Sequence, residues 1–313
     1  MRRAQRRRRM SVRRRLSLGE RLVIAAPYLW IGAFFLAPMA LIAKISVSQS
    51  VLARPPYRPI FEFSDSLADI WAKAQTFTFE AYRALVSDTL YLESYLSSLT
   101  IAAVSTLITL IIAYPFALAM ARAPERLRPL LMGLAAAPFW TSFLIRVYAW
   151  IALLKDEGLI NNALMALGLI TAPLQMFATT GAVVVGIVYS YLPFMLLPLY
   201  AALERQDPSL REAAADLGAS PAQAFLRVTL PLSREGVVAG ALLVFIPAVG
   251  EFVIPDLLGG SETLMIGRTL WNDFFSNHDW PAASAAAIVL VAVLMIPLLL
   301  WERARLADEA DAG

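Results

Sequence analysis

Long apolar runs separated by short polar stretches dominate the order of residues along this chain. A helix needs about 20 mostly apolar residues to cross the hydrocarbon core of a bilayer. Six segments are apolar enough, at residues 22–47, 95–120, 130–154, 179–199, 236–258 and 281–301. The second is the clearest, because no charged residue occurs between Ser94 and Ala121. The pattern predicts an all-α, polytopic integral membrane protein with six transmembrane helices.

One polar stretch lies between the fourth and fifth apolar segments. Residues 212–231 read EAAADLGASPAQAFLRVTLP. Asp207 followed by proline is a typical helix start, because Asp accepts hydrogen bonds from free amide groups and Pro fits the first turn. Gly218 suits the left-handed end of that helix, and Ser220 followed by proline starts another. We predict two short helices joined by a glycine elbow.

The first of these short helices has features of a docking surface. Leu210, Ala214 and Leu217 lie on one face and form a small apolar ridge that can enter a groove. Glu212 and Asp216 are four residues apart, a like-charge pair that costs roughly a few tenths of a kcal/mol in an isolated helix. A cation from a partner would relieve that cost.

The basic residues gather at the start of the chain. Ten arginines lie within residues 2–21, and only Glu20 opposes them. Such a tail can bind nucleic acid or anionic lipid. Because it directly precedes an apolar run, we interpret it as a positive-inside anchor at the membrane lipid rather than a nucleic-acid site.

The charges of the remaining loops predict how the chain is oriented in the membrane. The loop at residues 122–129 holds three arginines and one acid, and the tail after Trp301 begins with Arg303 and Arg305. Both fall on the side of the N-terminus if six spans are present, so both termini are predicted to be cytoplasmic. Residues 48–93 then lie on the opposite side of the membrane.

These observations divide the chain into three parts. Residues 1–21 form a basic cytoplasmic tail, residues 22–302 a transmembrane domain, and residues 303–313 a second cytoplasmic tail. The polar stretch, taken as residues 204–233, falls in the cytoplasm.

Composition excludes several kinds of chemistry. The chain is 59% apolar and 16% charged, whereas soluble domains carry about 25% charged residues. There is no cysteine and a single histidine, His278, so neither a thiolate nucleophile nor a multi-histidine metal centre is available. The phosphate-binding sequence Gly-x4-Gly-Lys-Ser/Thr does not occur. We expect no catalytic residues, no cofactor and no ATP hydrolysis by this chain itself.

A carboxylate is expected deep in the fifth apolar segment. An acid at membrane depth is costly and usually faces the bundle interior or a water-filled path. Pro247, Gly250 and Pro255 weaken the helix around Glu251. Two interpretations stay open, namely a cation site on a translocation path and a structural ion pair with Arg146.

Aromatic side chains gather on the third and fourth segments. They are Trp140, Tyr148, Trp150, Tyr189 and Tyr191. Aromatic faces bind organic ammonium groups by cation–π attraction, but the same residue types also form interfacial belts. The candidate pathway residues are Glu251, Tyr148, Trp150, Arg146 and Asp256. Of these, Asp256 is expected in a solvated loop at the outer mouth.

The polar stretch resembles a known family. Glu212-Ala213-Ala214, then glycine six residues after the Glu, then Leu230-Pro231, looks like the coupling loop of the permease subunits of binding-protein-dependent ABC importers. The resemblance implies type I ABC importer permease architecture and a loop that receives the motion of an ATPase. The residues that would take part are Glu212, Ala213, Ala214, Asp216, Leu217, Gly218, Leu230 and Pro231. An ordinary interhelical loop is the alternative.

The likeness extends to much of the chain. Residues 138–150, 158–162, 191–194 and 245–260 look like the spermidine/putrescine branch of these permeases, and residues 265–268 and 279–281 lean toward its putrescine subunits. Two departures bear on the ligand. Asp256 stands where that branch is expected to have Glu, and Lys155-Asp156-Glu157 stands where it tends to have uncharged polar residues.

The resemblance implies partners and a mechanism. The partners would be two ATPase subunits, a second homologous permease and a periplasmic substrate-binding protein, all at the bacterial inner membrane. Closure of the ATPases would push the coupling helices together and open the path toward the loaded binding protein. The alternatives are the same machine with another small cation or amine as cargo, and a secondary transporter or channel that needs no ATPase.

Overall fold

The computed structural model describes residues 18–311, apart from the side chains of a few residues near either end. Most of the predicted basic tail lies outside the described residues. The helices of the first half are α1 (Leu18–Ile31), η2 (Gly32–Leu36), α2 (Ala37–Ser46), α3 (Leu67–Ala74), α4 (Glu80–Ser87), α5 (Thr89–Arg122), α6 (Arg128–Ala136), η3 (Ala137–Trp140) and α7 (Phe143–Leu154). Those of the second half are α8 (Leu159–Ala166), α9 (Thr180–Glu204), α10 (Ser209–Asp216), α11 (Pro221–Ala224), η4 (Phe225–Thr229), α12 (Leu230–Leu232), α13 (Arg234–Val249), α14 (Val253–Leu258), α15 (Ile266–Trp271), η5 (Asn272–Ser276) and α16 (Trp280–Asp311).

Within residues 18–311, strand structure is confined to one small hairpin. Strands β1 (Gln49–Ser50) and β2 (Tyr57–Arg58) pair antiparallel, with Gln49 opposite Arg58. The all-α class predicted from the sequence is therefore confirmed.

Four helices are long and apolar enough to cross a membrane, and two bent pairs bring the number to six if each pair is one span. The four are Val23–Ser46, Thr89–Arg122, Thr180–Glu204 and Trp280–Arg303. The bent pairs are Arg128–Trp140 with Phe143–Ala166, at 86°, and Pro221–Leu232 with Arg234–Val249, at 66°. Each of the six predicted spans overlaps one of these helices or pairs. The bend of the first pair falls inside the third predicted span, whereas that of the second pair, between Leu232 and Arg234, lies just before the fifth.

The third predicted span, residues 130–154, is broken near its centre. Pro138 lies in the first turn of the 3-10 helix η3, and the Thr141 hydroxyl donates to the Pro138 carbonyl at 2.8 Å. Thr141 and Ser142 then adopt extended backbone before α7 begins. Because proline offers no amide hydrogen and the backbone turns out of the helical region, a single helix cannot continue.

The fifth predicted span, residues 236–258, breaks where the sequence indicated weakness. Helix α13 ends at Val249, and α14 begins at Val253. The backbone of Gly250 and Glu251 at this break packs against Gly267 of α15, where an added Cβ would lie 2.4 Å from the Gly250 carbonyl oxygen. The break is therefore held by close backbone packing as well as by the helix-weakening residues.

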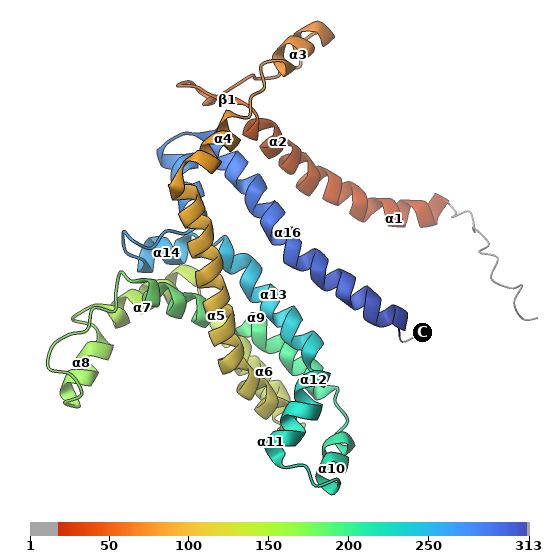
Figure 1. Ribbon diagram of the computed structural model, residues 1–313, viewed down its shortest axis with the longest axis vertical. Helices are drawn as coiled ribbons and strands as arrows, with labels where there is room; N and C mark the ends of the chain where they lie inside the picture. The colour runs from red at the N-terminus through yellow and green to blue at the C-terminus, as the bar shows by residue number, and fades with distance from the viewer. Residues whose placement is uncertain (1–17, 312–313) are drawn as a thin grey trace, which may run out of the picture.

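Helices α5, α9 and α13 form the centre of the bundle (Figure 1). Glycines let α13 approach α9 closely. A Cβ added at Gly236 would lie 2.5 Å from the Ala202 Cβ and 2.8 Å from the Pro198 carbonyl oxygen, and one added at Gly240 would lie 2.7 Å from the Met195 sulfur. Small residues at such contacts are the usual means by which membrane helices pack.

A Gly236→Val variant is expected to lose stability, because the added side chain meets the backbone of α9. Overpacking of this kind costs about 1–3 kcal/mol or more. The matched control is Gly133→Val on α6, where an added Cβ meets no atom within 4 Å. Melting in detergent, followed by size-exclusion chromatography, should show a lower midpoint for Gly236→Val alone. Equal midpoints for the two variants would contradict the close packing.

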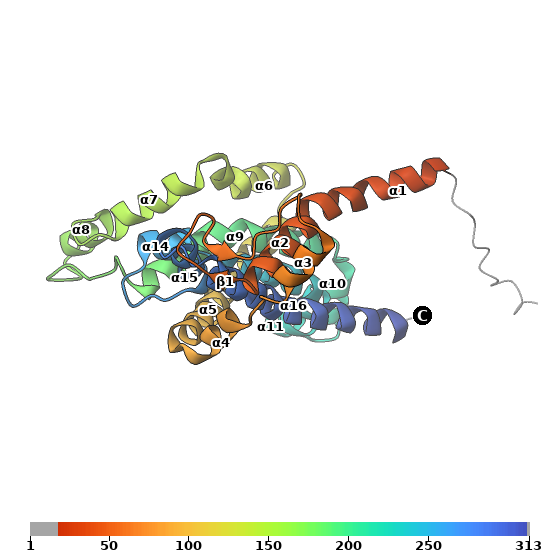
Figure 2. The ribbon, with the colours of Figure 1, turned by 90° about the horizontal axis from the view of Figure 1, so that it is seen from above.

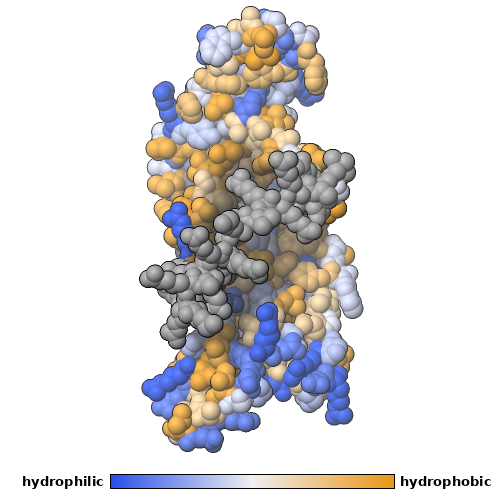
Figure 3. Space-filling model, turned by 90° about the vertical axis from the view of Figure 1, so that its right-hand side faces the viewer, coloured by the Kyte–Doolittle hydropathy of each residue, from blue (hydrophilic) through white to orange (hydrophobic). Residues whose placement is uncertain are grey.

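The elements are arranged along one long axis. Helices α10 and α11 lie at one end, and the β1–β2 hairpin and α3 lie at the other (Figure 1). Helices α1 and α2 run out to the side of the bundle, where α2 packs against α16 (Figure 2). In the view of Figure 3, hydrophilic residues gather at the lower end, where α10 and α11 lie. The two ends are therefore separate candidates for contact with soluble partners.

Candidate coupling and translocation sites

The predicted helix–elbow–helix is present between α9 and α13. Helix α10 starts after Asp207, whose Oδ1 accepts the Ser209 amide at 2.9 Å, and this bond lowers the pKa of the Asp207 carboxyl. At the other end Gly218 has φ +81°. The Gly218 amide donates to the Ala215 carbonyl at 2.9 Å and the Ala219 amide to the Ala214 carbonyl at 3.0 Å. This is the Schellman helix end, in which glycine takes the left-handed position.

The second short helix begins with a complete capping box. The Gln223 amide donates to the Ser220 hydroxyl at 3.3 Å, and the Ser220 amide donates to the Gln223 Oε1 at 2.9 Å. The helix continues from α11 through η4 and α12 and then bends into α13. The second arm of the elbow is thus continuous with α13 of the bundle.

The surface of this element is open. Of the eight residues predicted to contact an ATPase, Ala214 is half-buried and the others are exposed. Leu217 is 90% exposed. No ion pair to a described residue is found for Glu212 or Asp216, so the like-charge pair is not relieved within residues 18–311.

The base of the element is anchored by residues that the sequence did not single out. The Tyr114 hydroxyl lies 2.7 Å from the Ser233 hydroxyl, and the Tyr114 ring meets the Phe225 ring edge-on at 5.5 Å between centroids. The Gln206 side-chain amide donates to the Thr229 carbonyl at 3.0 Å. These contacts join segments that are far apart in the sequence, and local spacing contains no signal for them.

A cavity of about 460 Å³ lies at the end of α9, close to where the chain enters α10. Glu204 accepts hydrogen bonds from the Tyr200 hydroxyl at 2.7 Å and from Arg128 at 3.2 Å. None of the predicted pathway residues lines it; its lining is Glu125, Arg128, Pro129, Met132, Tyr200 and Glu204. The ion pair joins the start of α6 to the end of α9.

Glu251 occupies the break between α13 and α14 and is 7% exposed. Its Oε1 accepts the amides of Phe252 at 3.1 Å, Val253 at 3.0 Å and Ile254 at 3.4 Å. Its Oε2 accepts the Tyr191 hydroxyl at 2.6 Å. The carboxylate therefore caps the start of α14 and ties it to α9, which satisfies amides that a broken membrane helix would otherwise leave free.

Arg146 does not form the ion pair with Glu251 that the sequence allowed. The side chain is 8% exposed, and its Nε and Nη1 have no hydrogen-bond partner among the described residues. The guanidinium lies 5.8 Å from the Phe139 ring centroid and 5.7 Å from that of Phe143. Backbone amides and the Tyr191 hydroxyl bind the Glu251 carboxylate, whereas two phenylalanine rings lie beside the Arg146 guanidinium.

Aromatic rings connect these two charged residues. Phe139 lies 5.1 Å from Phe194 between ring centroids, and Phe194 lies 5.8 Å from Tyr191. The rings therefore run from the guanidinium of Arg146 to the carboxylate of Glu251. Phe139 and Phe194 were not predicted as pathway residues, because their pairing depends on the fold of α9 against the broken third span.

The other predicted pathway residues take different positions. Trp150 packs edge-on against Tyr189 at 5.5 Å, whereas Tyr148 is exposed on α7. Asp256 lies in α14 rather than in a loop, and its Oδ1 is 3.2 Å from Nε of Arg268. Tyr191 and Glu251 are brought together, while Tyr148 and Asp256 face outward. No cluster of three or more metal-ligating side chains occurs among the described residues.

A bundle of apolar helices with a rigid polar helix pair at one end is the arrangement of a membrane transport permease. The chain belongs to the family of binding-protein-dependent transport system inner membrane components, whose pattern matches residues 111–304. That match includes the polar stretch at residues 204–233, so the family predicted from this stretch is confirmed. The chain is thus a multi-pass component of a bacterial inner membrane.

Relatives and solved structures agree with this family. The chain is 44% identical to the spermidine/putrescine transport system permease protein PotB of Salmonella typhimurium (strain SL1344), over 74% of this chain and 81% of the relative. It is 31% identical to the inner membrane ABC transporter permease protein YdcU of Escherichia coli (strain K12), over 90% and 88%. The fold matches a bacterial alginate ABC transporter crystallised with an alginate-bound periplasmic protein, with a TM-score of 0.66, 16% identity, and 90% and 91% coverage. The likeness to spermidine/putrescine permeases is confirmed, while the lean toward putrescine subunits stays a prediction.

Proposed function

We propose that this chain is the transmembrane permease subunit of an ATP-driven polyamine importer, and that α10 and α11 receive the motion of a separate ATPase. The identity of 44% to a spermidine/putrescine permease supports the cargo class. The observation that carries the coupling role is the rigid, exposed helix–elbow–helix centred on Gly218, which continues into α13. The sequence has no phosphate-binding loop, so another subunit supplies the energy.

The proposed assembly contains this chain, a second homologous permease, two ATPase subunits and a periplasmic substrate-binding protein. Both termini and the elbow lie in the cytoplasm in this assembly, because arginine-rich segments favour the cytoplasmic side of a membrane. The α3 end then lies in the periplasm. Inward and outward states of the bundle are biased by the ATPases through the elbow.

The proposal is tested by uptake in cells that lack their own polyamine importers. The chain is expressed with the second permease, the ATPase and the binding protein, and entry of radiolabelled putrescine and spermidine is measured. We expect uptake that stops when ATP is depleted or when the ATPase is omitted. Uptake without an ATPase would show a secondary transporter, and the absence of polyamine uptake in an assembled complex would show a different cargo.

A further inference from the structure

Arg146 is a buried cation whose charge no contact described so far balances. Its side chain is 8% exposed, and among the described residues no other lysine or arginine is buried. Its Nε and Nη1 are enclosed and have no hydrogen-bond acceptor in that part of the chain. A charged side chain within a membrane is costly and is normally paired, so an unpaired one points to a function.

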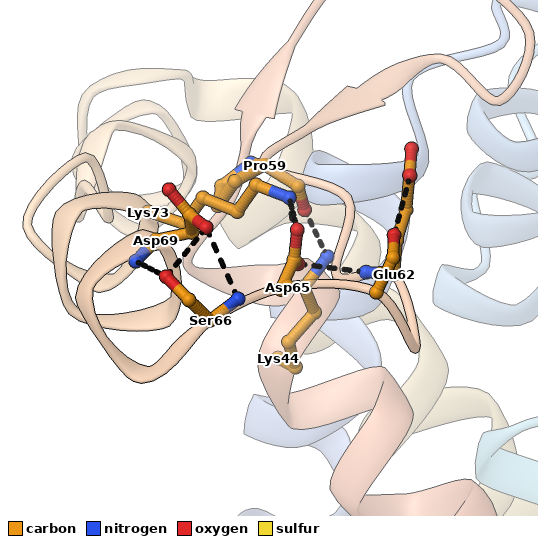
Figure 4. Close-up of polar contacts among 8 residues, drawn as sticks. Lys44, Pro59, Glu62, Asp65, Ser66, Asp69 and Lys73 are labelled. Atoms are coloured by element: carbon orange, nitrogen blue, oxygen red, sulfur yellow. Dashed lines mark hydrogen bonds and ion pairs between the residues drawn. The ribbon is translucent and has the colours of Figure 1, made fainter.

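The segment between α2 and α4 shows the usual arrangement of a partly buried cation (Figure 4). The Lys73 ammonium donates to both Asp65 oxygens at 2.6 Å. The Lys44 ammonium, at the end of α2, donates to the Pro59 carbonyl. Both lysines are half-buried, and both have an oxygen acceptor. Arg146 is more deeply buried than either, and Phe139 and Phe143 are what lies beside its guanidinium.

The position of Arg146 in α7 adds to the cost of its charge. Helix α7 begins at Phe143, and the Arg146 amide closes its first turn by donating to the Ser142 carbonyl at 3.2 Å. The first turn contains no acidic residue, and the Ser142 side chain does not cap it. The N-terminus of a helix carries a positive partial charge, which an acid balances and a cation increases. The potential at the break in the third predicted span is therefore locally positive.

Two phenylalanine rings take the place of an anion beside the guanidinium. Their centroids, at 5.8 Å for Phe139 and 5.7 Å for Phe143, lie within the range of cation–π attraction. Organic ammonium groups bind aromatic rings by the same attraction. Arg146 thus occupies rings at which an ammonium group of a cationic cargo would otherwise bind.

The row of rings that starts at Phe139 ends at the opposite charge. It continues through Phe194 to Tyr191, whose hydroxyl donates to the Glu251 carboxylate at 2.6 Å. Phe139 and Phe194 are 39% and 38% exposed, so the row lies at the surface of the isolated chain. In the proposed assembly, a second permease covers this surface and completes a path along it. A cation on that path is attracted at one end and repelled at the other.

We propose that Arg146 is an electrostatic barrier on the translocation path, which keeps cations from leaking through the transporter between transport cycles. A fixed positive charge beside a path excludes cations, and its field is strong where little water screens it. Thr141 and Ser142 have extended backbone and separate α7 from η3, so α7 can move as a unit and carry the charge off the path. The inference rests on the proposed function and deepens it, because it names the group that prevents uncoupled transport.

The test uses the whole complex in proteoliposomes that are loaded with radiolabelled putrescine and kept without ATP. Arg146→Met removes the charge and keeps a long side chain, and we expect putrescine efflux about tenfold faster than with the wild type, or more, because the barrier is lowered. Arg146→Lys keeps the charge and should leak no faster than the wild type. The matched control is Lys155→Met, which removes a positive charge from an exposed position at the other end of α7 and should leave the leak unchanged.

A neutral solute distinguishes a charge barrier from a structural support. Erythritol has four carbons, as putrescine does, but no charge, so its efflux should stay at the wild-type rate in Arg146→Met. Equal acceleration of both solutes would show that Arg146 holds the broken span together, and it would overturn the proposal. An unchanged putrescine leak would overturn it as well. So would loss of the second permease from the purified Arg146→Met complex, because the charge would then pair with that subunit.

The same vesicles report on the proposed function separately, through ATP-dependent uptake by the wild-type complex with its binding protein. If the wild type takes up putrescine and Arg146→Met does not leak, the barrier is wrong and the proposed function stands. If the wild-type complex takes up no polyamine, the proposed function is wrong, and the inference falls with it.

Discussion

A Gly218→Val variant is expected to lose at least about nine-tenths of its ATP-dependent uptake while it still inserts into the membrane. Gly218 has φ +81°, a conformation that costs an ordinary L-residue about 1–2 kcal/mol and is a genuine outlier for a β-branched one. Since about 1.4 kcal/mol corresponds to a factor of ten, the elbow would rarely adopt its functional geometry. Uptake per membrane-inserted protein, measured with radiolabelled polyamine, checks the prediction.

The controls for Gly218 separate backbone conformation from side-chain volume. A Cβ at this position meets no atom of the chain within 4 Å, so the substitution creates no internal clash. Asparagine tolerates the left-handed conformation, and Gly218→Asn should keep most of the uptake. If Gly218→Asn is as inactive as Gly218→Val, the glycine is required because its lack of a side chain leaves space for a partner, and the backbone angle is not the reason. Wild-type uptake by Gly218→Val would show that transport does not depend on the conformation of the elbow.

The helix–elbow–helix formed by α10 and α11 was predictable from the sequence because its signals are local. Asp207, Gly218 and Ser220 each act on amides or carbonyls within a few residues, and the structure contains the bonds that those residue types imply. The same holds for the four unbroken spans, which depend only on the length of an apolar run. Local interactions determine both the helix–elbow–helix and the unbroken spans, so one sequence was sufficient to predict them.

The broken spans and the Glu251 site were less predictable because they depend on distant segments. Proline and glycine indicated weakness near Glu251, but the Tyr191 hydroxyl that binds its carboxylate comes from another helix, 60 residues away. The bend near Pro138 was missed because the run remains apolar through it. Hydropathy reports that a segment prefers lipid, and it does not report whether the backbone stays straight.

Arg146 illustrates the limit of pairing by charge. Opposite charges in the third and fifth apolar segments made an ion pair between Arg146 and Glu251 a reasonable interpretation, since isolated charges at membrane depth are costly. In the structure the amides at the start of α14 and the Tyr191 hydroxyl bind the carboxylate, and Phe139 and Phe143 flank the guanidinium. Helix breaks create amide donors that a sequence does not display, and these donors compete for the acid.

A Glu251→Gln variant is expected to lower polyamine uptake about tenfold or more without preventing membrane insertion. Hydrogen bonds to a charged group contribute about 1.5–3 kcal/mol, roughly twice a neutral bond, so the amide caps α14 less firmly. It also presents an NH2 group or a weaker acceptor to the Tyr191 hydroxyl, and it removes the negative charge beside the aromatic rings. Uptake of radiolabelled putrescine and binding-protein-stimulated ATPase activity are the measurements.

The Tyr191→Phe variant distinguishes the two ways in which Glu251 can act. It removes the 2.6 Å bond to Oε2 and keeps both the carboxylate and its three amide partners. If the negative charge attracts the cationic cargo, Tyr191→Phe should transport nearly as well as the wild type while Glu251→Gln does not. If the carboxylate holds the α13–α14 break against α9, both variants should lose uptake together, and both should melt at lower temperature. Wild-type uptake and stimulation in Glu251→Gln would exclude both roles, since neither survives replacement of the charge.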